Sequence, residues 1–187
     1  MFRRIIMLLA LATVTLSGCA TSVGTRSTAF YEPSYVPEGS IAVVANPSLD
    51  ADSIQFSNYR ATIEQKLQLA GYQLADSPGS AEFIAELNYG IDDGSSKLVP
   101  YYGNPNGQVS TVSRTIYKRV LTLDIFQQGN RENTSSPRKV LELKAVSSGS
   151  CGDIAPVFDE IVEVAFKDFP SENGQAHTGK IVMEGDC

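Results

Sequence analysis

Three segments in the middle of the chain alternate apolar and polar residues, and this pattern most constrains the fold. The segments are 81–91, 115–126 and 139–146. Because successive side chains of a strand point to opposite faces, each segment predicts a strand with one buried face. Consecutive amphipathic strands that are joined by turn-rich links predict an antiparallel sheet with one covered face.

Two apolar stripes at helical spacing predict the helices that cover this sheet. The first stripe predicts a helix at about 53–70, and Gly71 follows it where a left-handed cap is favoured. The second predicts a helix that starts after Asp153, whose side chain caps it, and that stops at Phe169-Pro170.

Short apolar runs at 40–46 and 180–184 predict a buried strand and an edge strand. We therefore expect an α+β fold with an antiparallel sheet of about four to six strands and two helices packed on one face. The segment 40–187 has a length that is typical of one domain, and we expect a single domain there.

The first eighteen residues have the three parts of a secretory signal. Arg3 and Arg4 provide the positive start, an apolar run at 5–14 follows, and Ser17 and Gly18 are small residues before the cleavage point. The apolar run is too short to span a bilayer, since a spanning helix needs roughly 20 residues.

The residues Leu16-Ser17-Gly18-Cys19 are similar to the lipobox of bacterial lipoproteins, in which the cysteine is diacylated and becomes residue one. The resemblance implies a lipoprotein signal peptide at 1–18 and a lipid on Cys19 that anchors the chain durably. An ordinary signal with an unmodified cysteine is the alternative. Ala20, where an Asp commonly marks inner-membrane retention, favours the outer membrane, and we expect the domain to face the periplasm.

The segment 19–39 contains many Thr, Ser, Gly and Pro residues, and we expect a flexible tether there that starts at lipidated Cys19. The chain carries a net charge of −6. An acidic surface repels phosphate backbones, so we expect no nucleic-acid partner, and membrane contact only through the N-terminal lipid.

The chain offers little of what catalysis requires. His177 is its single histidine and has no metal-ligand spacing with a Cys or an acid, so we expect a solvated loop residue. Asp92-Asp93-Gly94 lacks the further oxygen ligands of a calcium loop and predicts a turn. We expect no catalytic, cofactor-binding or metal-binding residues and a protein that is not an enzyme.

A twenty-residue segment at 94–113 separates two of the predicted strands, and it is longer than a hairpin needs. Long loops tend to be functional or disordered, and Tyr101 and Tyr102 supply flat amphipathic rings that binding surfaces favour. We predict that they contact an envelope protein partner. The alternative is a flexible tip whose tyrosines fold back on the sheet.

Cys151 and Cys187 remain once Cys19 is acylated. In an oxidising compartment, two remaining cysteines in turn-like surroundings predict a disulfide. Unpaired thiols, or a bridge between chains through Cys187, are the alternatives.

The residues at 63–90 and 121–127, and the closing helix that ends at Phe169-Pro170, resemble a family of uncharacterised bacterial lipoproteins, domain of unknown function 4136. The family usually has a Trp-x-Gly before its last helix, where this chain has 140–146 without a Trp. The resemblance implies an envelope lipoprotein with no known reaction and adds no site residues.

These observations favour a non-enzymatic binding or accessory module of the cell envelope. A hydrolase of envelope polymers is one alternative. A self-assembling subunit of an export apparatus is another, because the run at 40–46 with the helix after it is similar to accessory lipoproteins of export and assembly machines.

Overall fold

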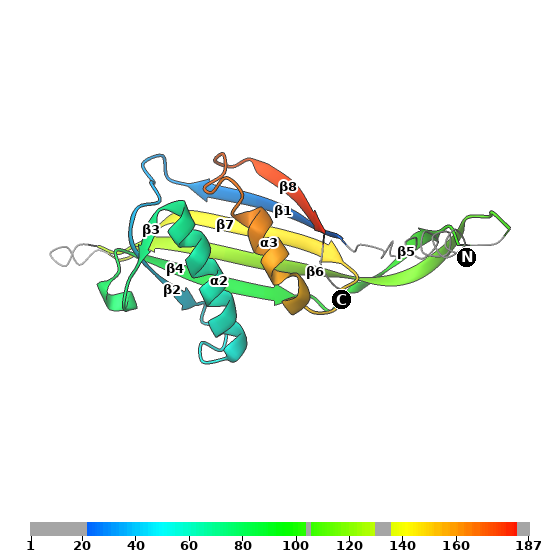
Figure 1. Cartoon of the computed structure of the whole chain (residues 1–187), viewed down its shortest axis with the longest axis horizontal. Coiled ribbons are helices and arrows are strands. Elements are labelled where there is room, and N and C mark those ends of the chain that lie inside the picture. Colours follow the sequence, from blue (N-terminus) through cyan, green and yellow to red (C-terminus); the bar gives the residue numbers. More distant parts are fainter. Residues whose placement is uncertain (1–21, 104–105, 130–135, 183–187) are drawn as a thin grey trace, which may run out of the picture.

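The computed structural model describes residues 22–103, 106–129 and 136–182. Its main element is a sheet of eight strands in the order β3-β2-β4-β6-β7-β1-β8, with β5 paired to β6 beyond this path (Figure 1). The strands are β1 (Ser22–Tyr31), β2 (Gly39–Ala45), β3 (Tyr72–Leu74), β4 (Phe83–Ile91), β5 (Ser95–Tyr101), β6 (Ser110–Gln127), β7 (Arg138–Gly149) and β8 (Ala176–Val182).

The sheet is mixed, so the predicted antiparallel sheet of four to six strands is wrong. β2 runs parallel to both of its neighbours, β3 and β4, whereas the other strand pairs are antiparallel. The reason is the helix α2 (Ile54–Ala70), which carries the chain from the end of β2 back to its start. A helical crossover of this kind joins parallel strands, whereas a short turn joins antiparallel ones.

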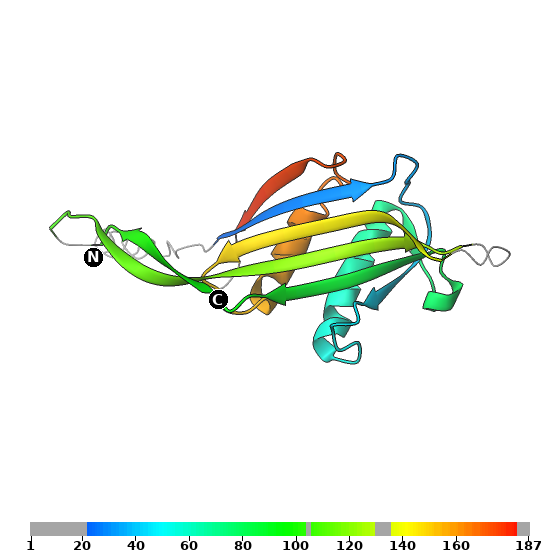
Figure 2. The ribbon, with the colours of Figure 1, turned by 180° about the vertical axis from the view of Figure 1, so that it is seen from behind.

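Both helices lie on one face of the sheet, and no element of the described residues covers the opposite face (Figures 1 and 2). α2 packs against β2 and β3, and α3 (Phe158–Ala165) packs against β1, β7 and β8. The two helices meet where the rings of Tyr59 and Phe158 stack with centroids 3.6 Å apart. Within the described residues, no helix is long and apolar enough to cross a bilayer.

The predicted helix at 53–70 is confirmed. Ser53 caps it, since its Oγ accepts a hydrogen bond of 3.1 Å from the Phe56 amide. Phe56, Tyr59, Ile63 and Leu67 form its buried stripe. The second helix is shorter than predicted: a 3-10 turn, η2 (Ala155–Val157), precedes α3, and α3 ends at Ala165.

Residues 22–31, which the sequence places in a flexible tether at 19–39, form β1, so this part of the tether prediction is wrong. β1 lies inside the sheet and pairs with β7 on one side and β8 on the other. Four small or medium side chains alternate on its buried face: Val23, Thr25, Ser27 and Ala29. Hydroxyl residues on that face conceal the alternation that a hydrophobic pattern would reveal.

The edge strand β8 spans 176–182 and therefore begins earlier than the predicted segment at 180–184. The core between sheet and helices is apolar and continuous; its fully buried members include Ile41, Leu87, Leu123, Leu143 and Ile161.

Candidate functional site

The predicted loop at 94–113 is largely a β-hairpin. β5 pairs antiparallel with residues 110–116, the first part of β6, and this two-stranded arm projects from one end of the sheet (Figures 1 and 2). We call residues 95–116 the arm. At its base the predicted turn at 92–94 is wrong, because β4 and β5 both run antiparallel to β6 and the chain continues in one direction. Residues 92–94 are instead an irregularity between the two strands, where Asp92 Oδ1 accepts hydrogen bonds from the amides of Gly94 (3.1 Å) and Lys118 (2.8 Å).

The register gives the arm two different faces. One face combines cations with apolar and aromatic residues, namely Lys97, Val99 and Tyr101 of β5 with Val112, Arg114 and Ile116 of β6. The other face is mostly hydroxyl-bearing, and Ser96 and Ser113 are joined there by a hydrogen bond of 2.5 Å between their Oγ atoms. Alternation along the strands separates these two chemistries.

The arm carries large apolar side chains that the protein itself leaves uncovered. Tyr102 is 76% exposed and Leu98 is 74% exposed, and Val109 and Tyr101 are also exposed. Tyr101 lies over Gly103, whose backbone leaves no room for a Cβ beneath the ring. The structure therefore places both predicted residues, Tyr101 and Tyr102, at the outer end of the arm with their rings accessible.

The charge of the arm opposes that of the whole chain. No Asp or Glu occurs from Gly94 to Leu123, although the chain carries a net charge of −6. Lys97 and Arg114 are register partners, and no carboxylate of the described residues lies within ion-pair distance of either. The arm thus presents an unneutralised positive pair beside apolar side chains.

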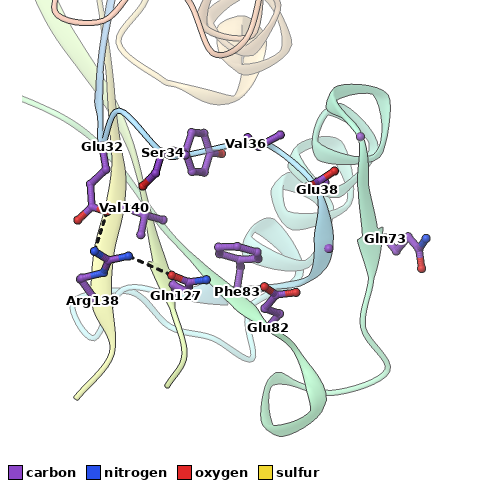
Figure 3. A pocket seen from close by; sticks show the side chains of 13 residues that line it. Glu32, Ser34, Val36, Glu38, Gln73, Glu82, Phe83, Gln127, Arg138 and Val140 are labelled. Carbon is purple, nitrogen blue, oxygen red and sulfur yellow. Dashed lines mark hydrogen bonds and ion pairs between the residues drawn. The ribbon is translucent and has the colours of Figure 1, made fainter. Parts of the chain in front are cut away.

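A cleft of about 650 Å³ lies at the other end of the sheet (Figure 3). Arg138 forms one wall, where its Nη1 lies 2.9 Å from Glu32 Oε2 and its Nη2 donates to Gln127 Oε1 at 3.2 Å. Glu82 and Phe83 stand on the opposite side (Figure 3). The residues come from β2, β3, β4, β6, β7 and the links before β2, β3 and β4, and no local sequence pattern joins them.

Tyr35 lines this cleft and contacts the buried Tyr72. The hydroxyls of Tyr35 and Tyr72 are 2.5 Å apart. The pKa of Tyr72 is raised to about 12, mainly because the residue is buried. The hydrogen bond with Tyr35 lowers this pKa, and the charge of the Glu82 carboxylate raises it. Burial also raises the pKa of Tyr35, and Tyr72 adds to this rise. Both rings therefore stay neutral, and neither hydroxyl serves as a base near neutral pH.

The charged groups that line the cleft are one cation and three carboxylates. Arg138 neutralises Glu32, whereas Glu38 and Glu82 form no ion pair among the described residues. No group of three or more metal-ligating side chains comes together among the residues that the structure describes. The cleft is an open, polar hollow.

His177 does not lie in a solvated loop, as the sequence predicts. It lies in β8 and pairs in register with Ser27 of β1. Its Nε2 is 2.8 Å from the carbonyl oxygen of Val164 at the end of α3. The histidine therefore joins the last strand to a helix, which is a structural contact.

Sequence reasoning missed one buried cation, Arg119. It is 2% exposed, and its Nη1 donates to the carbonyl oxygen of Cys151 at 3.1 Å. Burial lowers the pKa of Arg119, and the charge of Asp92 opposes this effect. The alternation of the strand places Arg119 on the same face as Leu121 and Leu123, but a cation gives no hydrophobic signal there. The fold reveals that it is buried.

Of the three cysteines, only Cys151 lies among the described residues, and it is a buried residue of the loop between β7 and η2. The lipidation site Cys19 and the predicted disulfide partner Cys187 lie outside them. Lipidation and the disulfide therefore stay predictions.

Neither a protein-family model nor a curated protein matches this chain. Among solved structures, a PDZ domain protein from Parabacteroides distasonis is similar over 87% of this chain, with a TM-score of 0.48 and 12% identity. This chain spans 40% of that chain. A similarity at this level fixes neither the fold nor the function.

Proposed function

We propose that this protein is a non-enzymatic binding module of a bacterial cell envelope. A lipid on Cys19 anchors it in the outer membrane, and its folded domain faces the periplasm. The arm, with Tyr101 and Tyr102 near its tip, is the element that binds a partner in the envelope.

The observation that carries this proposal is the exposure of apolar side chains on a projecting hairpin. Leu98, Tyr102 and Val109 are all more than half exposed, and they gather on one short element. Grouped apolar exposure of this kind marks interaction sites, whereas single exposed apolar residues are ordinary. Tyrosine suits such a site because its ring offers contact area and its hydroxyl a hydrogen bond.

The chemistry of the cleft supports the non-enzymatic part of the proposal. Its Arg138 is paired with Glu32, and burial keeps Tyr35 and Tyr72 protonated. A catalytic site is expected to bring titratable groups together with pKa values shifted towards the working pH. The shifts at Tyr35 and Tyr72 go in the opposite direction.

The anchor is tested by the state of Cys19. Mass spectrometry of the membrane fraction is expected to find an acylated cysteine as the first residue of the mature chain. Cys19→Ala is expected to move the protein from the membrane fraction to the soluble fraction. A mature chain that starts elsewhere and carries no lipid would refute this part of the proposal.

The arm is tested by photocrosslinking in intact cells. A benzoylphenylalanine at position 101 or 102 is expected to form adducts, because this side chain reacts with the C–H bonds of a neighbouring protein or lipid. The matched control is the same residue at position 69, since Leu69 on α2 is 76% exposed, as is Tyr102. Equal yields at the three positions would show that the arm binds no partner, and adducts with a second copy would favour self-assembly.

A further inference from the structure

We infer that the partner of the arm is the surface of the bilayer that holds the lipid of Cys19. This inference rests on the proposed function, because it names the partner of the same arm. The membrane contact then has two points, a covalent lipid and a hairpin.

The first argument is direction. β1 is antiparallel to β7, and β7 is antiparallel to β6, so β1 and β6 run the same way. The starting end of β1, where the chain from Cys19 enters, therefore lies at the end of the sheet from which the arm projects. Figures 1 and 2 show the start of β1 and the arm at this same end.

The second argument is register. Thr25 pairs with Ser147, and Gly149 pairs with Tyr117, so Val23 lies level with Tyr117 two strands away. Ser22 is then level with Ile116, which pairs with Ser95, the first residue of β5. The arm thus begins at the level at which β1 begins.

The third argument is reach. Two residues, Ala20 and Thr21, separate Cys19 from Ser22, and the three residue steps span at most about 11 Å when fully extended. The arm continues for six residues from Ile116 to Ser110, which is roughly 20 Å of strand. The tip therefore extends about 10 Å further along the strands than the lipidated residue can. A bilayer that holds the lipid of Cys19 lies within reach of the tip.

The fourth argument is the order of side chains along the arm. Tyr101, Tyr102 and Val109 lie near the tip, and Lys97 and Arg114 lie closer to the base. Tyrosine is enriched at the membrane–water interface, and cations near an anionic surface are attracted to its headgroups. The arm therefore places apolar and aromatic groups deepest, with the cation pair behind them at the level of the phosphates.

The hydrogen bonding of its backbone limits how deeply the arm can enter the bilayer. β5 pairs only with β6, and residues 110–116 of β6 pair only with β5, so both outer edges of the described arm carry unpaired backbone groups. Such groups are costly in hydrocarbon, where water is not available to bond them. The arm consequently occupies the interface and does not span the membrane.

The chain contains no tryptophan, and this permits a direct measurement. A single Tyr102→Trp variant of the lipidated full chain is placed in vesicles of phosphatidylethanolamine and phosphatidylglycerol. Its emission is expected to shift to the blue, and lipids brominated near the headgroup end of their acyl chains are expected to quench it. The Leu69→Trp variant is the matched control and is expected to show neither effect.

The same fluorescence and quenching at positions 102 and 69 would overturn the inference. If the crosslinks from positions 101 and 102 are then to a protein, the proposed function stands and only the lipid partner is wrong. If these positions also give no adducts above position 69, the proposed function fails as well.

The cation pair gives an independent test. In the unlipidated Cys19→Ala chain, the double substitution Lys97→Gln and Arg114→Gln is expected to weaken binding to the same vesicles about thirtyfold, since each cation near an anionic surface contributes about 1 kcal/mol. The matched control is Lys66→Gln, because Lys66 pairs with Glu163 on the body of the domain. Equal binding of the two variants would contradict the inference.

Discussion

Replacement of Gly71 by alanine is expected to destabilise the protein by about 2–4 kcal/mol, from backbone strain and overpacking together. Gly71 ends α2 with a φ of 120° and a ψ of −2°, and its amide donates to the carbonyl oxygen of Gln68 at 3.1 Å. A side chain rarely adopts such a φ. A Cβ there would also lie 2.6 Å from the carbonyl oxygen of Pro37, a backbone atom that cannot turn aside.

Two other glycines separate these two causes. Gly39→Ala meets a similar φ, 99°, but the nearest atoms to its Cβ belong to side chains: Glu82 Oε2 at 2.6 Å, the end of a flexible side chain, and Phe83 Cε2 at 3.2 Å. We expect a cost of about 1–3 kcal/mol, mainly from backbone strain. Gly90→Ala has open space around its Cβ and no positive φ, so we expect it to be neutral or stabilising by about 0.5–1 kcal/mol.

The assay is urea unfolding followed by far-ultraviolet circular dichroism. The expected result is a midpoint that falls in the order Gly90→Ala, Gly39→Ala, Gly71→Ala, with an unchanged dependence on urea. If Gly71→Ala unfolds within about 0.5 kcal/mol of Gly90→Ala, neither strain nor the contact with Pro37 limits this position.

Three further predictions concern a cap, a pH dependence and a disulfide. Ser53→Ala is expected to cost about 1 kcal/mol in the same unfolding assay, because the Phe56 amide loses its cap. Since the folded state raises the pKa of Tyr72 to about 12, it keeps a proton that the unfolded chain releases above pH 10. The contribution of Tyr72 to the free energy of unfolding is therefore fully present below pH 10, and it falls by about 1.4 kcal/mol per pH unit between pH 10 and 12. Tyr72→Phe should reduce the dependence of the free energy of unfolding on pH in this range. Oxidised Cys151 and Cys187 would close a loop of about 36 residues and stabilise by roughly 3.5–4 kcal/mol, which a reductant should abolish; free-thiol labelling of both without reductant would contradict the pairing.

The elements that the sequence predicts well are those in which the buried positions are apolar and recur with the period of a helix or a strand. α2 has a buried stripe of large apolar residues and a cap at Ser53, and β4, β6 and β7 alternate large apolar residues with polar ones. In each case the residues that face the core are apolar and most of them are large, so the alternation or the helical period is visible in the sequence. These segments become α2 and the centre of the sheet.

The elements that the sequence misses are those whose buried face is polar or whose faces are both exposed. β1 buries Thr25 and Ser27, which are typical of loops, and the arm has no covered face that would impose an apolar period. The parallel pairing of β2 was missed for another reason. Alternation indicates a strand but not its direction, and direction depends here on the crossover through α2.

The position of β1 changes what the lipid anchor does. A flexible tether would let the domain tumble above the membrane, and no surface of it would face the bilayer consistently. β1 is instead hydrogen-bonded to a strand on each side, and Val23 is buried one residue after β1 begins. Only Ala20 and Thr21 separate this fixed strand from Cys19, so the lipid that we propose on Cys19 would constrain which end of the sheet faces the membrane. The arm projects from that end (Figure 1), and the proposed contact with the bilayer would therefore need no reorientation of the whole domain.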